Sequence, residues 1–350
     1  MNNTNLNMFG WDSYCEERLE GQYEAARVLL EHKHMYRVMC EDGEYIAELS
    51  GKFRYETLAK GDYPAVGDWV AVTKLPNEKK VIIQQVLPRK SSFSRKVAGE
   101  KTEEQIVAAN VDYLFLVNAL NADFNIRRIE RYLLLAYESG ATPVIVLTKS
   151  DLCLEVEQRF IEVESVAIGV PIFVVDSLHK IGIEELQSFV EQGKTIALIG
   201  SSGAGKSTLL NALMGRDAAK TGDIRESDSK GRHTTTHREL FKLPNGGLVI
   251  DTPGMRELQL WEGSGAIYTT FSDIEEAAQN CRFRDCKHEK EPGCAVWCAI
   301  EEGVLTEGRL LNYKKLQKEV AYAMRRQDPV LARAEREKWK KVTKQHKKKK

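Results

Sequence analysis

Short runs of alternating apolar and polar residues recur over the first part of the chain. They lie at residues 26–30, 35–40, 45–49, 68–72 and 81–86, and turn sequences such as Glu41-Asp42-Gly43 separate them. Alternation of this kind between turn residues is typical of β-strands. Five short strands predict a small barrel. We favour an OB-like barrel because such barrels have five strands, although the strand count also allows an SH3-like barrel.

The pattern changes further along the chain to strands that alternate with helices. Apolar runs of strand length lie at residues 113–117, 144–147, 172–175 and 195–199, and amphipathic stretches of helix length lie at residues 126–138, 155–167 and 183–190. This alternation predicts a parallel sheet with helices on both faces. Ligands of such sheets bind at the carboxyl ends of the strands. We therefore look for chemistry in the loops that follow these strands.

The patterns divide the chain into three domains with connecting and terminal segments. The predicted parts are an N-terminal extension (1–25) to which we assign no function, the barrel (26–88), a polar linker (89–104), the α/β domain (105–271), a small helical domain (272–330) and a basic tail (331–350). The helical domain contains a helix-like run over residues 310–326. We expect a multidomain α/β protein.

The zero net charge of the 350-residue chain hides an uneven distribution. Residues 331–350 hold ten Lys or Arg against two Glu, so this tail carries +8 and the rest of the chain −8. A basic tail on an acidic body indicates a polyanionic partner, although a solvated tail explains the charge equally well. There is no apolar run of 18 residues and no basic segment followed by an apolar core at the N-terminus. We therefore expect a cytoplasmic protein with no membrane contact.

A glycine-rich segment joins the strand at 195–199 to the helix-like run at 208–214. Its backbone N–H groups can surround a polyphosphate, Lys206 can reach the β- and γ-phosphates, and the Ser207 hydroxyl can hold Mg²⁺. This context of strand, glycine loop and helix predicts nucleotide binding. The candidate binding residues are Gly200, Ser201, Ser202, Gly203, Ala204, Gly205, Lys206, Ser207 and Thr208.

Two further loops match motifs that bind a guanine nucleotide together with a phosphate loop. Thr148, Lys149, Ser150 and Asp151 follow a strand and resemble the Asn-Lys-x-Asp motif of GTPases, in which the Asp accepts hydrogen bonds from guanine. Adenine lacks those donors, so Asp151 speaks against an ATPase. Thr148 stands where the motif usually has Asn, which leaves open whether that residue's contact with the phosphate loop is kept.

The second loop matches Asp-x-x-Gly. Asp251 and Gly254 follow the apolar residues 248–250, and in this motif the Asp holds Mg²⁺ through water while the Gly N–H meets the γ-phosphate. Ordinary GTPases have the phosphate loop first, then Asp-x-x-Gly, then the base motif. Here the base motif precedes the phosphate loop, so the domain reads as circularly permuted.

Four of the seven cysteines crowd between residues 281 and 298, which is typical of a metal site and not of a disulfide framework. Cys281, Cys286, His288 and Cys294 form a Cys₃His set, enough for one closed, structural Zn²⁺ site. Cys298 is a spare cysteine that can replace Cys294 as the fourth ligand. Bound zinc would stabilise a segment too short to build its own core.

A barrel, a permuted GTPase domain and a Cys/His cluster together resemble the RsgA family of small ribosomal subunit-dependent GTPases. The segments Gly-Arg-His-Thr-Thr-Thr (231–236), Asp-Thr-Pro-Gly-Met-Arg-Glu (251–257) and Cys-Arg-Phe-Arg-Asp-Cys-Lys-His (281–288) are similar to that family's signatures. The resemblance covers residues 26–320. It implies a GTP-hydrolysing switch in assembly of the 30S subunit, with 16S rRNA as a partner. The alternative is a GTP-dependent RNA-binding protein whose hydrolysis is incidental.

The expected cofactors are Mg²⁺ with GTP and one structural Zn²⁺. Candidate Mg²⁺ ligands are Ser207, Asp251 and a switch threonine among residues 234–236, for which we choose Thr235. Met255 stands where Ras-like GTPases have the Gln that orients water, so His233 is the candidate catalytic residue. We expect a monomer that does not bind DNA.

Basic residues beside aromatic ones mark candidate RNA-contacting surfaces. In the barrel these are Lys52, Arg54 and Lys60 with Phe53 and Tyr55, although a solvated barrel face explains them equally well. The helix-like run at 310–326 carries further basic residues, Lys314, Lys315, Lys318, Arg325 and Arg326.

Overall fold

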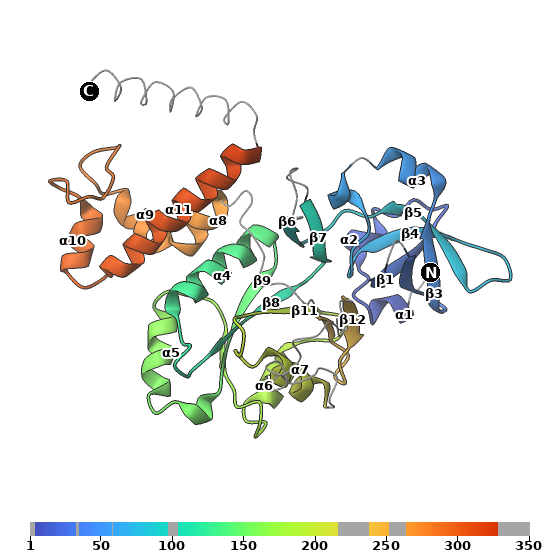
Figure 1. Cartoon of the computed structure of the whole chain (residues 1–350), viewed down its shortest axis with the longest axis horizontal. Helices are drawn as coiled ribbons and strands as arrows, with labels where there is room; N and C mark the ends of the chain where they lie inside the picture. The colour runs from blue at the N-terminus through green and yellow to red at the C-terminus, as the bar shows by residue number, and fades with distance from the viewer. Residues whose placement is uncertain are drawn as a thin grey trace, which may run out of the picture. The chain divides into compact units, whose positions relative to one another are not determined.

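A computed structural model describes residues 4–32, 35–57, 59–96, 104–215, 238–251 and 264–327. The chain forms two compact units, Met1–Gln259 and Leu260–Lys350, and each is described here by itself. The first unit contains the barrel and the α/β part, and the second is helical (Figure 1). The boundaries of the six segments expected from the sequence stay predictions. Helix α8 (Ser264–Thr270), which the sequence assigned to the α/β domain, belongs to the second unit.

The N-terminal part is a closed five-stranded barrel. The strands pair in the order β1-β2-β3-β5-β4, and β4 also pairs with β1, which closes the barrel; β3 and β5 are parallel and all other pairs are antiparallel. Inward positions such as Val28, Val38 and Val72 are fully buried because alternate residues of a strand face the core. A short helix, α3 (Gly51–Glu56), connects β3 to β4. The OB-like barrel is confirmed, with strands β1 (Glu24–His32), β2 (Met35–Cys40), β3 (Gly43–Leu49), β4 (Trp69–Lys74) and β5 (Lys80–Val86).

The segment expected as a polar linker contains a strand instead. Strand β6 (Ser92–Lys96) pairs antiparallel with β7 (Glu104–Ala109), so residues 89–104 are not simply a connector. Phe93 of β6 is buried, and so are residues 106–109 of β7, so this hairpin packs against the core. Arg89, just before this hairpin, makes a bidentate ion pair with the buried Asp68 of the barrel.

The α/β part is a parallel sheet with one antiparallel strand, as predicted from the alternation of strands and helices. Five strands run parallel in the order β10-β9-β8-β11-β13, and β12 pairs antiparallel with β13. Helices α4 and α5 lie to one side of these strands and α6 and α7 to the other (Figure 1). The strands are β8 (Tyr113–Ala119), β9 (Thr142–Thr148), β10 (Ile172–Val174), β11 (Thr195–Ile199), β12 (Glu239–Lys242) and β13 (Leu248–Asp251), and the helices are α4 (Ile126–Ser139), α5 (Val156–Glu164), α6 (Ile183–Phe189) and α7 (Lys206–Met214).

Two features join the barrel to the α/β sheet. Strand β12 pairs with β1 at Glu239 and Leu30, so the two parts share one sheet. Arg27 of β1 is almost completely buried, and its guanidinium donates to the carbonyl oxygens of Phe9, Gly67 and Asn110 and to the Thr195 hydroxyl. Since these acceptors come from both the barrel and the α/β part, the Arg27 side chain links the barrel to the sheet.

The N-terminal segment, to which the sequence assigned no function, packs against both parts. Leu6, Phe9 and Trp11 are buried, and the rings of Trp11 and Trp69 meet edge to face at 4.8 Å. The Asn5 side chain donates to backbone carbonyls at the end of β2. Two short helices carry these residues, α1 (Thr4–Asn7) and α2 (Ser13–Glu16).

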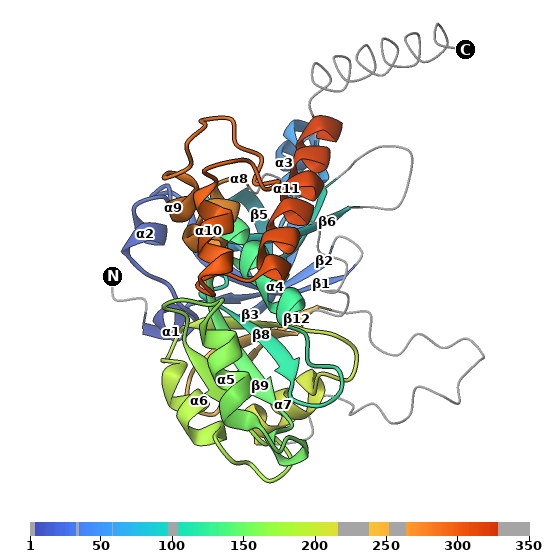
Figure 2. The same ribbon diagram turned by 90° about the vertical axis from the view of Figure 1, so that its left-hand side faces the viewer.

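The second unit is a small helical domain, as predicted. Figure 2 shows helix α11 beside α8. Arg309 of α11 makes a bidentate ion pair with Asp273, at 2.6 and 2.9 Å, and also donates to the Thr270 carbonyl. Besides α8, the helices are α9 (Ser272–Ala278), α10 (Ala295–Glu301) and α11 (Glu307–Gln327). Among the helices of the described residues, none is both long enough and apolar enough to span a bilayer.

Candidate functional site

The glycine-rich loop lies between β11 and α7, at the carboxyl edge of the parallel sheet. Gly200 passes so close to β8 that an added Cβ would sit 2.4 Å from the Val117 carbonyl oxygen, so no larger residue fits. Gly205 has a φ of 88°, a left-handed conformation that suits glycine, and it directly precedes the first residue of α7. The loop therefore turns sharply into the helix N-terminus, where backbone N–H groups favour an anion.

Lys206 is held against this loop. Its ammonium group donates to the Gly200 carbonyl at 2.8 Å and to the Ser201 carbonyl at 2.6 Å. Ser207 and Thr208 are half-buried on the first turn of α7. The loop and the first turn thus present a cation, hydroxyl groups and helix N–H groups together, which is the donor set of a polyphosphate site.

Thr148 joins the base-motif segment to the phosphate loop. It ends β9, is buried, and its hydroxyl donates to the Ala204 carbonyl at 2.6 Å. The sequence left this contact open because the motif usually has Asn at this position. A threonine hydroxyl makes it here, and a Cβ added at Gly205 would lie 3.4 Å from that hydroxyl.

The rest of the base-motif segment is shaped by an unusual backbone conformation. Lys149 has a φ of 59°, the left-handed region that non-glycine residues seldom adopt and that often marks functional loops. The short 3₁₀ turn Ser150–Leu152 follows and leaves Asp151 exposed to solvent. An exposed carboxylate at the end of a parallel strand is open to a ligand.

A neighbouring loop, which the sequence motifs did not single out, lies at the same edge. Strand β10 pairs with β9, and beyond it Asp176 accepts the backbone N–H groups of Leu178 and His179 at 3.0 and 3.1 Å. Hydrogen bonding to the Asp176 carboxylate raises the pKa of His179. The Ser177 hydroxyl is buried without a hydrogen-bond partner among the described residues. The rule that ligands bind beyond parallel strands could have indicated this loop from the sequence.

Several predicted site residues lie outside the described residues. These are His233 and Thr235, with the rest of the 234–236 group, and Gly254 and Met255. Asp251 is described for its backbone alone: it ends β13, and β13 pairs in parallel with β11, the strand that leads into the phosphate loop. The end of β13 therefore lies at the same sheet edge as that loop.

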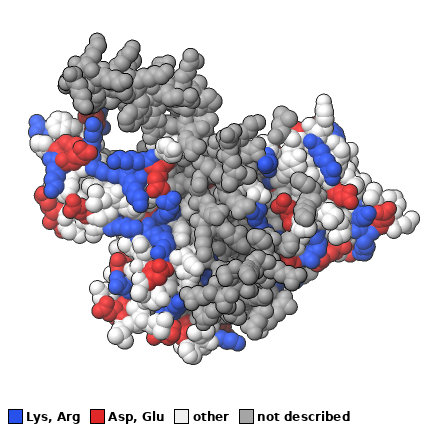
Figure 3. Space-filling view, viewed as in Figure 1, with Lys and Arg blue, Asp and Glu red and all other residues white. Residues whose placement is uncertain are grey.

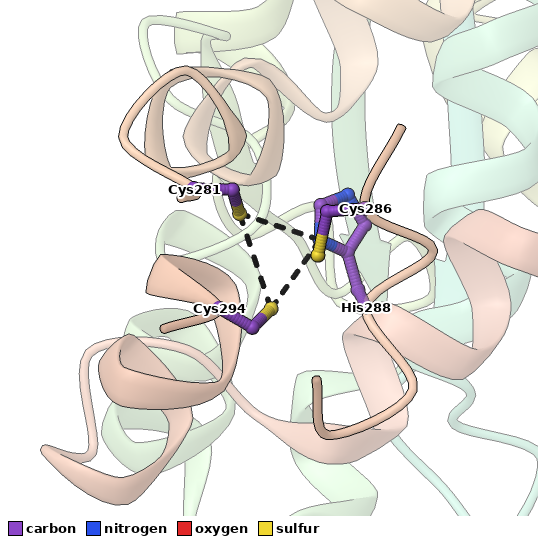
Figure 4. A group of neighbouring side chains, drawn as sticks. All are labelled: Cys281, Cys286, His288 and Cys294. Carbon is purple, nitrogen blue, oxygen red and sulfur yellow. Dashed lines mark hydrogen bonds between the residues drawn. The ribbon is translucent and has the colours of Figure 1, made fainter. Parts of the chain in front are cut away.

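The predicted metal ligands of the second unit lie together. Cys281, Cys286, His288 and Cys294 bring their ligand atoms within 4.8 Å of one another (Figure 4). Cys281 Sγ is 3.9 Å from Cys294 Sγ, and His288 Nδ1 is 3.7 and 3.5 Å from these two sulfurs. The spare cysteine, Cys298, is exposed and is not one of the four.

These distances fit a tetrahedral ion. With Zn–S of about 2.3 Å and Zn–N of about 2.1 Å, tetrahedral geometry sets ligand separations of about 3.8 Å between sulfurs and about 3.6 Å between sulfur and nitrogen. Burial acts to raise the pKa of the Cys281 thiol, but the backbone N–H groups of Val296 and Ala295 outweigh it and lower that pKa. Burial and the Lys314 ammonium lower the pKa of His288, which favours the neutral imidazole that binds metal.

The backbone around the cluster is braced by α10 and α11. The Trp297 indole and the Lys314 ammonium both donate to the His288 carbonyl at 2.8 Å. His288 itself has a φ of 54°. The loop that carries His288 is thus fixed by two helices of the same unit, which suits a structural site.

Basic side chains gather over α11 in the space-filling view (Figure 3). On this helix Lys315 and Lys318 are accessible to solvent. In the barrel, Tyr55 of α3 is 88% exposed and has Lys52 and Arg54 on the same short helix. Exposed aromatic and basic side chains are what single-stranded RNA surfaces use.

Comparison with known proteins gives concordant matches. A family model described as RsgA GTPase matches residues 86–261. The small ribosomal subunit biogenesis GTPase RsgA 1 of Oceanobacillus iheyensis is 48% identical over 348 residues, covering 98% of this chain and 99% of that protein. The corresponding protein of Opitutus terrae is 46% identical, covering 96% and 95%.

Two solved structures are similar over most of the chain. The crystal structure of YjeQ from Thermotoga maritima has a TM-score of 0.64 and 32% sequence identity, covering 85% of this chain and 98% of that one. The crystal structure of YloQ, described as a circularly permuted GTPase, has a TM-score of 0.60 at 24% identity, covering 85% and 95%. The permuted order predicted from the motifs is confirmed by this fold.

Proposed function

Because the chain belongs to the RsgA GTPase family, we propose that it hydrolyses GTP as a molecular switch in maturation of the small (30S) ribosomal subunit. One contact carries the proposal: the Thr148 hydroxyl binds the Ala204 carbonyl and so joins a base motif to a phosphate loop. The relatives named as ribosome biogenesis GTPases match nearly the whole chain, which extends the proposal from nucleotide binding to the ribosome.

Each part of the GTP site then has an assigned role. The backbone of residues 200–205 and the N-terminus of α7 bind the phosphates, together with the Lys206 ammonium group. Asp151 accepts the guanine N1–H and N2 amine, and Lys149 and Ser150 complete the base loop. Mg²⁺ would be held by Ser207, Thr235 and, through water, Asp251, and it would neutralise charge between the β- and γ-phosphates. Gly254 would donate its N–H to the γ-phosphate.

Hydrolysis is proposed to be slow until the partner is engaged. Met255 follows the Asp-x-x-Gly motif, and a thioether cannot orient an attacking water as the usual Gln does. His233 is the proposed substitute because an imidazole can accept a proton near neutral pH. The competing possibility is that the ribosome supplies this group.

The metal of the second unit is proposed to be one structural Zn²⁺ per chain. Three thiolates and one imidazole favour zinc, and four protein ligands leave no open position for catalysis. The barrel, α11 and the basic tail are proposed to contact 16S rRNA. We further propose that the protein is a cytoplasmic monomer that does not bind DNA.

The test is nucleotide-dependent binding to 30S subunits. Purified protein is sedimented with 30S subunits in the presence of a non-hydrolysable GTP analogue, GDP, or no nucleotide. We expect stoichiometric binding with the analogue and at least about tenfold weaker binding with GDP, as for a switch. Equal binding to 30S subunits with the analogue, with GDP and without nucleotide would contradict the switch. It would favour the alternative, an RNA-binding protein with incidental hydrolysis.

A further inference from the structure

An acidic side chain contacts the phosphate loop from outside the recognised motifs. Asp123 lies in the connection between β8 and α4, and the Ser201 hydroxyl donates to Asp123 Oδ2 at 2.5 Å. Strands β8 and β11 are neighbours in the sheet, so their following loops meet although 78 residues separate Asp123 from Ser201. The Ser201 carbonyl accepts Lys206 at the same point, so this residue is held by both its side chain and its backbone.

The Asp123 carboxylate is in turn held by Arg128 of α4. Arg128 Nη1 donates to Oδ2 at 2.7 Å and Nη2 donates to Oδ1 at 3.1 Å, a bidentate pair with fixed geometry. The guanidinium starts from the first turn of α4, where the Asn125 side chain accepts the Arg128 backbone N–H. The cap thus fixes the backbone from which Arg128 reaches the carboxylate.

The position of this carboxylate creates an electrostatic problem for an anion-binding loop. Arg128 first, and the Ser201 hydroxyl next, lower the pKa of Asp123, so it is ionised at neutral pH. This negative charge contacts Ser201, the second residue of the phosphate loop, and it therefore repels a bound polyphosphate. Arg128 cancels that charge, and Oδ2 accepts hydrogen bonds from both Arg128 Nη1 and the Ser201 hydroxyl.

We propose that Asp123 is a positioning residue of the phosphate loop, acting through Ser201, and that Arg128 makes its charge compatible with a bound nucleotide. The inference rests on the proposed function, since it assumes that the loop binds guanine nucleotides. Asp123 does not belong to the phosphate, base or Asp-x-x-Gly motifs. Because it acts on the loop that holds the phosphates common to both nucleotides, it affects GTP and GDP alike and leaves guanine selectivity unchanged.

The test measures the Kd of fluorescent GDP and GTP derivatives for a set of alanine variants. Asp123→Ala and Ser201→Ala should each raise both Kd values about fivefold by removing one hydrogen bond, and their combination should raise them no further. Arg128→Ala should raise Kd about thirtyfold, because the carboxylate remains without its cation. The double variant Asp123→Ala/Arg128→Ala should return to about fivefold.

This recovery separates positioning from a merely structural role. If Arg128 only stabilised α4, removing Asp123 as well would not restore affinity. Arg18→Ala is the matched control, since it removes an equal charge from the N-terminal segment, where Arg18 pairs with Glu17 and donates to the Tyr14 carbonyl. This control should bind as the wild type does.

The possible results are distinct. A wild type that does not bind GTP would overturn the proposed function and the inference with it. A wild type that binds, with Arg128→Ala unchanged or with the double variant binding no more tightly than Arg128→Ala, would overturn the role of Asp123 alone. Thermal unfolding of every variant checks that the folded protein is being compared.

Discussion

Replacing Arg27 with methionine should loosen the junction between the barrel and the α/β sheet. The guanidinium is 1% exposed and donates to Gly67 and Asn110 carbonyls at 3.1 and 3.0 Å, to the Thr195 hydroxyl at 3.0 Å and to the Phe9 carbonyl. Burial lowers the pKa of Arg27 to about 10, so the group is still charged at neutral pH. Methionine fills most of the same volume but donates nothing.

The cost follows from the acceptors left behind. Each buried acceptor without a donor costs about 1–3 kcal/mol, so four of them set an upper bound of about 4–12 kcal/mol. Removing a buried charge recovers several kcal/mol of desolvation, which offsets part of this loss. We expect a net loss of about 3–5 kcal/mol, a large fraction of the roughly 5–15 kcal/mol by which domains are stable.

Urea unfolding followed by tryptophan fluorescence measures this loss. Trp69 lies beside the Arg27 guanidinium, 5.1 Å from it, and Trp11 packs on Trp69, so both rings report on the junction. The matched control is Arg37→Met on the neighbouring strand β2. Arg37 also bridges to the α/β sheet, through Glu239, but it is 36% exposed, so its loss should cost no more than about 1 kcal/mol. Equal midpoints for the two variants would refute the role of Arg27.

Three other perturbations test separate parts of the account. Asp151→Asn should lower GTP affinity on the order of 10⁴-fold and favour xanthine nucleotides in competition titrations; similar wild-type affinities for ATP and GTP would contradict the assignment. Cys286→Ser should abolish stoichiometric zinc by elemental analysis and unfold the second unit while nucleotide binding persists, whereas Cys298→Ser should keep the metal. Thr148→Val should weaken GTP binding about tenfold while Thr148→Ser should not, because serine keeps the hydroxyl that reaches Ala204.

Local patterns predicted the parts of the fold whose residues repeat regularly. The barrel strands and the α/β alternation follow from periodicity, since each strand or helix must bury one face. The N-terminal segment has no such period. Leu6, Phe9 and Trp11 are each buried against the barrel and the sheet without a regular spacing, so only the tertiary structure reveals their role.

Contacts between loops far apart in the sequence were also not predicted. The strand β6 was missed because its polar residues lie beside a single buried Phe93, and its partner β7 begins only at the last residue of the predicted linker. Asp123 belongs to no motif, and the loop at Asp176 could have been indicated only by the general rule that ligands bind beyond parallel strands. They join the site only because β8 and β10 pair beside the strands that carry the motifs, β11 and β9.

The central claim is GTP hydrolysis that depends on the small ribosomal subunit. Its direct test is phosphate release from GTP by the purified protein, with and without 30S subunits, and with ATP as the control nucleotide. We expect slow release alone, because Met255 replaces the water-orienting Gln, and stimulation of at least about a hundredfold by 30S subunits. Release that is equal with and without 30S subunits, or equal for ATP and GTP, would contradict the account.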